Sequence, residues 1–298
     1  MTGSPQDGAR PADDADRAPS GAGTGTDTAT AGGALLQLRG IGKRFGPVSA
    51  LSGVNLDIPA GQVTALVGDN GAGKSTLIKT IAAIWEPSEG HLIWQGREVH
   101  FKSPHDATQA GIATVYQDLA LCDNLDIVAN MMLGHEVRRH LLLDEVSMEQ
   151  TAKQTLKDLR VVTVHNIRQL VGSLSGGQRQ SVAVAKAVML DAKLVIMDEP
   201  TAALGVSQTE LVLDLIRRLS ERGIAVLVVS HNLADVFQVA DRLAVLYLGR
   251  LVTAGPISEF DTASAVDLMT TGTTQRTISA GVAGPDGPTR NPDRRPEG

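Results

Sequence analysis

The sequence GDNGAGKST, residues 68–76, follows the apolar run VTALV and leads into the helix-like run STLIKTIAAI. It satisfies the spacing G-x-x-x-x-G-K-[ST], in which a glycine-rich turn joins a strand to a helix. Glycines let backbone N–H groups close around a phosphate, and the helix N-terminus adds positive potential there. The lysine can reach further phosphate oxygens, and the following hydroxyl can ligate Mg²⁺. The stretch therefore predicts a nucleotide-binding loop made of Gly68, Asn70, Gly71, Gly73, Lys74, Ser75 and Thr76.

Two acids follow a second apolar run in LVIMDEP, residues 194–200. A carboxylate at the carboxyl end of a parallel strand points into the crevice where such sheets bind ligands, so we expect Asp198 to hold the metal ion. Glu199 would then lie beside the terminal phosphate, where a carboxylate can polarise an attacking water.

The surrounding pattern predicts an α/β fold. IATVY, LVIMD and IAVLVVS are short apolar runs typical of strands buried on both faces, and helical segments separate them. This alternation predicts a mostly parallel sheet with flanking helices. HLIWQGREVHF predicts a hairpin about Gln95-Gly96, and SPHDATQAG predicts a short helix that Ser103 caps and Gly111 ends.

Further helices are expected on either side of these strands. Ser147 and Gln150 can form a capping box for a helix from Met148 to about Leu159. A helix ending at Gly223 would bury one apolar face, made of Leu211, Val212, Leu215, Ile216 and Leu219. The region from about 118 to 171 is mostly helical in pattern, which predicts a helical subdomain inserted in the α/β core.

Composition limits the function classes. The chain has 298 residues, 42% of them hydrophobic, and a formal net charge of −6 without a clustered basic stretch, which argues against nucleic-acid binding. Residues 1–33 and the end from about 279 are rich in small and polar residues, so we expect both to be disordered. No secretory signal or membrane span is evident, which predicts a cytoplasmic protein whose membrane association comes through a partner.

A second glycine turn occurs in SLSGGQRQS, residues 173–181. It precedes a helical run, so it presents backbone amides and the positive end of a helix dipole to an anion. Since Lys74 already serves one phosphate site, we expect this turn to contact a nucleotide on another copy.

With LSGGQ twenty residues before the acidic strand, the chain resembles the ATP-binding cassette (ABC) family, the ATPase subunits of ABC transporters, over about Leu35–Gly255. The resemblance implies a P-loop NTPase domain at 34–255 with an added antiparallel β-subdomain, and a C-terminal extension at 256–298. It also implies a head-to-tail dimer in which each ATP meets one subunit's phosphate loop and the other subunit's Ser175, Gly176, Gly177 and Gln178.

Three further residues match family motifs. Gln117 in VYQD corresponds to the glutamine that touches Mg²⁺ and the attacking water, and His231 in VVSHN to the histidine that contacts the terminal phosphate. The implied catalytic set is Glu199, His231, Gln117 and Lys74, with Ser75, Gln117 and Asp198 at the metal. Phe45 in KRFG corresponds to the aromatic that stacks on adenine; its alternative is an ordinary core aromatic.

One position departs from the family pattern. The family commonly has an aspartate that bridges the dimer after a sequence like S-A-L, but TAALGV carries Gly205 there. This puts cross-dimer communication in question, while we expect ATP hydrolysis to survive.

GIATVYQDLALCDNLDIVANMMLGHE and EPTAALGVSQTE are similar to the ATPases of ribose-, xylose- and fructose-type importers. The partners implied are a second ATPase subunit, with a homodimer expected, two membrane permease subunits and, indirectly, an extracytoplasmic sugar-binding protein. The permease would hold the chain at the cytoplasmic face of the membrane, through a groove made by Leu125, Ile127, Val128 and Met131, unless these residues are plain helical core.

Three other functions remain as alternatives. A soluble cassette ATPase acting on ribosomes or DNA usually has two cassettes, a long coiled-coil insertion or basic extensions. A GTPase would need an N-K-x-D motif, and neither a GTPase nor a small-molecule kinase accounts for LSGGQ. A non-hydrolysing regulatory cassette is disfavoured by Glu199 and His231.

Overall fold

The computed structural model describes residues 33–140, 142–161, 163–164 and 166–273. The tails predicted at 1–33 and from 279 lie outside these residues, apart from Gly33.

A six-stranded sheet forms the centre of the fold, with strand order β12-β11-β3-β10-β9-β6. Its members are β3 (Val63–Val67), β6 (Ile112–Val115), β9 (Leu194–Asp198), β10 (Ala225–Val229), β11 (Arg242–Tyr247) and β12 (Arg250–Pro256). Five strands run parallel, and β12 pairs antiparallel with β11 at one edge. The mostly parallel sheet predicted from three apolar runs is confirmed.

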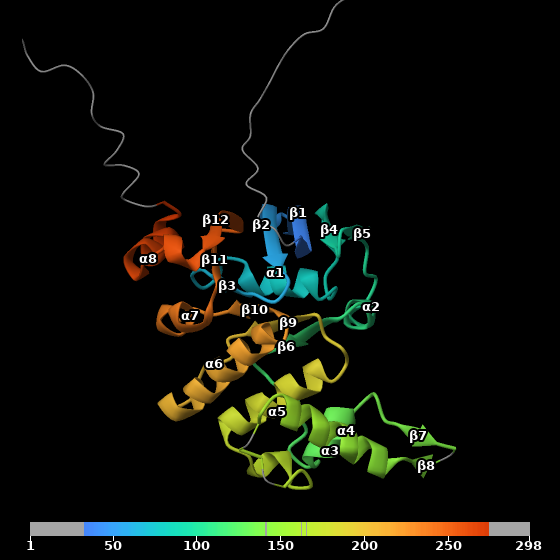
Figure 1. The fold of residues 1–298 in the computed structure, drawn as a ribbon. Coiled ribbons are helices and arrows are strands. Elements are labelled where there is room, and N and C mark those ends of the chain that lie inside the picture. The colour runs from blue at the N-terminus through green and yellow to red at the C-terminus, as the bar shows by residue number, and fades with distance from the viewer. Residues whose placement is uncertain (1–32, 141, 162, 165, 274–298) are drawn as a thin grey trace, which may run out of the picture. The chain divides into compact units, whose positions relative to one another are not determined.

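Alternate residues of the central strands enter two separate hydrophobic cores. On β9, Leu194 and Ile196 pack with α1 (Lys74–Ile81), whereas Val195 and Met197 pack on the other face. The other face is covered mainly by α5 (Gly176–Val188), α6 (Val206–Glu221) and α7 (Leu233–Val239). Figure 1 shows α1 and these helices on opposite sides of the strands. Burial on both faces is the reason that these strands read as unbroken apolar runs.

A second, antiparallel sheet packs over α1 with strand order β2-β1-β4-β5. It consists of β1 (Ala34–Phe45), β2 (Val48–Pro59), β4 (Glu89–Trp94) and β5 (Arg97–Val99). Trp94 pairs with Arg97 across the hairpin predicted at Gln95-Gly96. Ser103 caps α2 (Pro104–Gln109) by accepting a hydrogen bond from the N–H of Asp106, as its sequence predicts.

The region predicted as a helical subdomain contains α3 (Ile127–Met132), the short hairpin of β7 (Arg138–Arg139) and β8 (Leu142–Leu143), α4 (Glu145–Asp158) and the 3₁₀ turn Val171–Ser173. The prediction that Ser147 caps the second helix is wrong. Asp144 is the cap and accepts from the N–H of Ser147, so α4 begins one turn earlier. The limits of this subdomain remain a prediction.

The apolar face predicted for α6 is correct in four of its five residues. Leu211 is 39% exposed and Leu213, at 2%, takes its place in the core. The helix begins at Val206, and its buried residues are Val212, Leu213, Leu215, Ile216 and Leu219.

After β12 the chain continues through the 3₁₀ turn Ile257–Glu259 into α8 (Thr262–Thr271). In the described part of the chain no helix combines the length and the apolar character needed to cross a bilayer.

Candidate functional site

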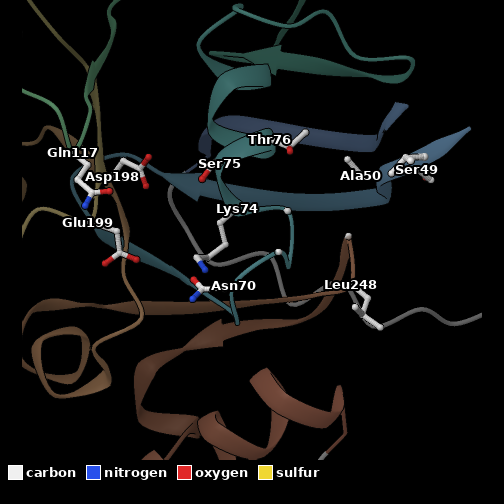
Figure 2. A pocket seen from close by; sticks show the side chains of 14 residues that line it. Ser49, Ala50, Asn70, Lys74, Ser75, Thr76, Gln117, Asp198, Glu199 and Leu248 are labelled. Carbon is white, nitrogen blue, oxygen red and sulfur yellow. The ribbon is translucent and has the colours of Figure 1, made fainter. Parts of the chain in front are cut away.

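A cavity of about 590 Å³ opens where the glycine-rich loop meets the carboxyl end of β9. Figure 2 shows the acids and Gln117 at one end of it, Lys74 and Asn70 in the middle, and Ser49 and Leu248 at the other end. Its lining residues are Val48, Ser49, Ala50, Asn70, Gly71, Gly73, Lys74, Ser75, Thr76, Gln117, Asp198, Glu199, Leu248 and Gly249. The cavity is thus elongated between an acidic end and an uncharged end.

Two glycines of the loop are required by their surroundings. A Cβ at Gly68 would collide with the carbonyl of Leu246 on β11. Gly73 has φ +105°, and a Cβ there would lie 2.9 Å from the carbonyl oxygen of Ala50. The loop therefore passes too close to two neighbouring strands for any other residue.

Lys74 is the first residue of α1 and is buried beneath the loop. Its Nζ donates to the carbonyl oxygens of Gly68, at 2.7 Å, and Asp69, at 3.1 Å. An ammonium group has three N–H donors, so one remains for an oxygen in the cavity.

The two acids that end β9 have different surroundings. Burial raises the pKa of the Asp198 carboxyl, the charge of Glu199 raises it further, and Lys74 and Lys79 lower it in part. A half-buried carboxylate beside a second acid is stabilised by a cation placed between them. Burial also raises the pKa of Tyr116, and Asp198 adds to this effect.

Glu199 is held in an uncommon backbone conformation, with φ +49°. Its N–H donates to the carbonyl of Val229 at 2.9 Å, which fixes the turn to the end of β10. Its Oε1 lies 2.9 Å from Nδ1 of His231, so the carboxylate and the imidazole form a pair at the cavity edge. The histidine is 66% exposed and the carboxylate 16%.

Oxygens suited to Mg²⁺ occur together in the same cavity. Ser75, Gln117 and Asp198 line it and offer a hydroxyl, an amide carbonyl and a carboxylate. These are hard oxygen ligands, which Mg²⁺ prefers, usually together with waters and substrate phosphates. Among the described residues, no group of three or more His, Cys, Asp or Glu side chains could hold a metal ion by itself. The donor set therefore fits an ion that also binds a phosphate.

Phe45 does not line this cavity. Its ring packs edge-on against Trp85 with a centroid distance of 4.8 Å, and it is 41% exposed. It ends β1 opposite Val48, which does line the cavity. Its role as an adenine platform remains a prediction.

The second glycine turn also lies outside this cavity. Ser175 and Gln178 form the capping box of α5, and the amide of Gln178 donates to the carbonyl of Thr163 at 2.6 Å. Gly176 and Gly177 face Leu204 and Gln208, which a Cβ would approach to 2.7 and 3.1 Å. The two glycine turns are therefore not parts of one binding site within a single chain.

Sequence reasoning missed the uncharged end of the cavity. Val48, Ser49 and Ala50 come from the start of β2, and Leu248 and Gly249 from the turn between β11 and β12. No motif marks them, because what brings them to the loop is strand pairing. Of these residues only Gly249 is of a type that marks a close backbone approach, and a Cβ there would lie 2.7 Å from the carbonyl oxygen of Ala50.

The family model for ABC transporters matches residues 51–202, which include the loop, Gln117, both acids and the second glycine turn. The chain belongs to the ABC transporter family. It is 45% identical over 243 residues to the fructose import ATP-binding protein FrcA of Rhizobium meliloti. It is 44% identical to the xylose/arabinose import ATP-binding protein XylG of Sulfolobus acidocaldarius. Each match covers 79% of this chain and 94% of the relative.

Solved structures of ABC cassettes share the fold. One ATP-binding cassette of an ABC transporter superposes with a TM-score of 0.71 at 27% identity, over 79% of this chain and 96% of that one. A second cassette, solved as a dimer in a post-hydrolysis state with ADP and phosphate, superposes with a TM-score of 0.64 at 25% identity, over 74% and 98%. The expected α/β fold of the ABC ATPase type is confirmed.

Proposed function

We propose that this ABC transporter protein is the ATP-hydrolysing subunit of an importer for a monosaccharide. One observation carries the proposal: the chain matches 94% of the length of two sugar import ATP-binding proteins, and its candidate phosphate, metal and water ligands line one cavity. These ligands are Lys74, Ser75, Gln117, Asp198 and Glu199, and His231 is hydrogen-bonded to the last of them. Both relatives are import ATP-binding proteins by name, which favours import over the alternative of a soluble ATPase acting on ribosomes or DNA.

The shape of the cavity suits ATP in one orientation. The phosphates would lie on the loop of Gly71, Gly73, Lys74 and Thr76, whose backbone N–H groups and ammonium are positive. The base would lie toward Val48 and Leu248 at the uncharged end. Phe45, paired with Val48 across the β1–β2 turn, would need only to turn from Trp85 to stack on that base.

For hydrolysis, Glu199 is the group that would orient and polarise a water. The Nδ1 of His231 is hydrogen-bonded to its carboxylate, a contact that would fix the direction of the acid and would keep the imidazole beside a bound terminal phosphate. The hydrogen bond from the Glu199 N–H to Val229 keeps both at the cavity edge. Gln117 would complete the set by contacting the same water.

Ser75, Gln117 and Asp198 would hold Mg²⁺ together with the phosphate oxygens. When bound, the ion would neutralise phosphate charge and charge that develops during phosphoryl transfer. The raised pKa of Asp198 supports this role, because a nearby cation would offset the cost of keeping that carboxylate ionised.

The dimer would complete each site. The second glycine turn lies outside the chain's own cavity, and ABC cassettes occur as dimers in solved structures. Ser175, Gly176, Gly177 and Gln178 of one subunit would therefore cover the ATP bound on the loop of the other, with a homodimer as the simplest arrangement.

The surface predicted to receive the permease needs a correction. Ile127, Val128 and Met131 are buried and Leu125 is half-buried, so three of the four predicted residues are core, as in the alternative interpretation, and do not line a groove. A cavity of about 360 Å³ lies beside Gln117 instead, lined by Asp118, Leu119, Leu121, Asp123 and Arg179. We propose this cavity as the permease contact, because Gln117 would then lie at both the nucleotide and the permease and could link them. That contact would hold the chain at the cytoplasmic face of the membrane.

The test uses Glu199→Gln beside the wild type in Mg-ATP. We expect the variant to lose hydrolysis by about 100-fold or more, the usual value of a positioned general base, and to accumulate as an ATP-bound dimer in light scattering. Restored uptake of labelled fructose, xylose or ribose in cells lacking the gene would test the import role. A wild type that neither hydrolyses ATP nor dimerises, alone or with its permease, would contradict the proposal.

A further inference from the structure

Asp235, in the first turn of α7, is a carboxylate buried to 8% exposure. Its Oδ2 accepts a hydrogen bond from the hydroxyl of Thr201 at 2.7 Å. A buried carboxylate is costly unless it is hydrogen-bonded, so this bond holds the two residues together.

Thr201 belongs to the turn that follows the two acids of β9. Two non-glycine residues of this turn have positive φ, namely Glu199 at +49° and Ala203 at +61°. Such conformations persist only where the surroundings fix them. Within the turn, the N–H of Ala202 donates to Glu199 at 3.1 Å and that of Leu204 to Thr201 at 3.3 Å. The Thr201 side chain is the group that fastens this turn to a helix.

The turn and the segment that begins at His231 are joined twice. At the cavity edge the exposed imidazole of His231 meets Glu199. Beneath it, Asp235 holds Thr201, which is two residues after Glu199, while Asp235 is four residues, about one helical turn, after His231. The buried Thr201–Asp235 hydrogen bond therefore fixes the position of the turn relative to α7, so that Glu199 and His231 lie within hydrogen-bond distance.

The far end of the turn lacks such an anchor. Gly205 is the cap of α6 and makes no side-chain cap hydrogen bond. A cavity of only about 10 Å³ adjoins Thr201 and Asp235, at the lower limit of what one water needs, so solvent is a poor substitute for the hydroxyl.

We propose that Asp235 is a positioning residue for ATP hydrolysis, which acts through Thr201 to hold Glu199 against His231. This inference rests on the proposed ATPase function. The bond does not touch the nucleotide loop, so its loss should lower kcat and leave the KM for ATP unchanged.

Thr201→Val tests the inference, with Thr64→Val as a matched control. Thr64 is a buried threonine of β3 whose hydroxyl has no hydrogen-bond partner among the described residues, so the same substitution there removes no bond. We expect Thr201→Val to lower kcat about tenfold, less than the roughly hundredfold that a 1 Å misplacement can cost, with KM within twofold. Thr64→Val should match the wild type, and Thr201→Ser, which keeps the hydroxyl, should recover most of kcat.

Asp235→Ala provides a second route to the same result. If the two residues act through one bond, the double variant Thr201→Val/Asp235→Ala should be no slower than the slower single variant. Equal kcat for Thr201→Val and Thr64→Val, in an active wild-type background, would overturn the positioning role alone. So would a Thr201→Ser variant as slow as Thr201→Val. A wild type without ATP hydrolysis would instead refute the proposed function, and the positioning role with it.

Discussion

The chain has two glycine turns that each precede a helix, Gly68–Thr76 before α1 and Leu174–Gln178 before α5, yet they differ in what surrounds them. The first has its lysine beneath it, three candidate metal ligands beside it and the proposed catalytic carboxylate, Glu199, within the same cavity. The second packs against Leu204 and Gln208 of its own chain. None of its residues lines the cavity that contains Lys74, the candidate metal ligands and Glu199.

The helix starts differ in the same way. At α1 the cap is Gly73, with no side-chain cap bond, and Lys74 supplies the charge. At α5 the capping box uses the N–H groups of Ser175 and Gln178. Among the described residues, the N–H groups of Gly176 and Gly177 have no such partner, so they remain as donors for a ligand. The comparison supports the proposal that the first turn binds phosphate with groups of its own chain, whereas the second turn needs the loop of another subunit.

The largest effect should come from Lys74→Ala. Removing a buried ammonium that we propose to contact phosphate should cost about 3 kcal/mol, or about 100-fold in ATP affinity, and abolish hydrolysis. A fluorescent ATP analogue titrated against purified protein measures this. Lys79→Ala is the control, because Lys79 lies on the same helix but over the Trp85 ring, outside the cavity lining. Equal affinity for Lys74→Ala and the wild type would remove the first turn from the site.

A smaller and different effect is expected at the second turn. Gly177→Asp adds a negative charge on the Gln208 side of the first turn of α5, where it opposes the positive helix end that would attract phosphate. Hydrolysis should therefore fall about 10- to 100-fold, while the affinity of the first turn for ATP stays within about twofold. Gly177→Ala is the matched control, since it adds the same Cβ near Gln208 without the charge.

Mixing variants separates the two turns further. A dimer of Lys74→Ala with Gly177→Asp keeps one intact composite site, whereas wild type mixed with the double variant keeps none. ATPase activity should therefore survive in the first mixture and be lost from mixed dimers in the second. The reverse result, activity in the mixed dimers of wild type with the double variant and none in those of Lys74→Ala with Gly177→Asp, would mean that the second turn serves its own chain.

Much of the fold could be predicted because its signals are local. The strands β6, β9 and β10 are apolar on both faces, and Ser103 and Gly111 bound α2 as their residue types require. The start of α4 could not be read correctly, because both Asp144 and Ser147 are good caps and the choice depends on where the preceding hairpin ends.

The candidate site divides in the same way. The sequence predicts Lys74, Asp198 and Glu199 as site residues because phosphate chemistry needs those residue types at that spacing. The structure places all three in one cavity lining. Ala50, Leu248 and the Asp235–Thr201 bond depend on which strands and helices become neighbours, which one sequence does not encode locally. Met131 and its neighbours illustrate the reverse error, since an apolar helix face reads the same whether it is buried or meets a partner.

The smallest effect should come from Gly205→Asp, which tests how firmly the second turn is supported. Gly205 caps α6 with φ −75° and ψ 162°, a conformation open to any residue, and a Cβ there meets nothing within 4 Å. An aspartate can accept from a first-turn N–H and restricts the unfolded chain, so the free energy of unfolding should rise by about 0.5 kcal/mol. The urea midpoint measures this.

Gly205→Ala is the control for that change, because it restricts the unfolded chain equally but offers no cap oxygen and is a poorer cap than glycine. The two variants should therefore move the urea midpoint apart. If they move it together, the cap contributes nothing. In that case Leu204 and Gln208 are held beneath Gly176 and Gly177 by packing and by the Thr201 bond rather than by the start of α6.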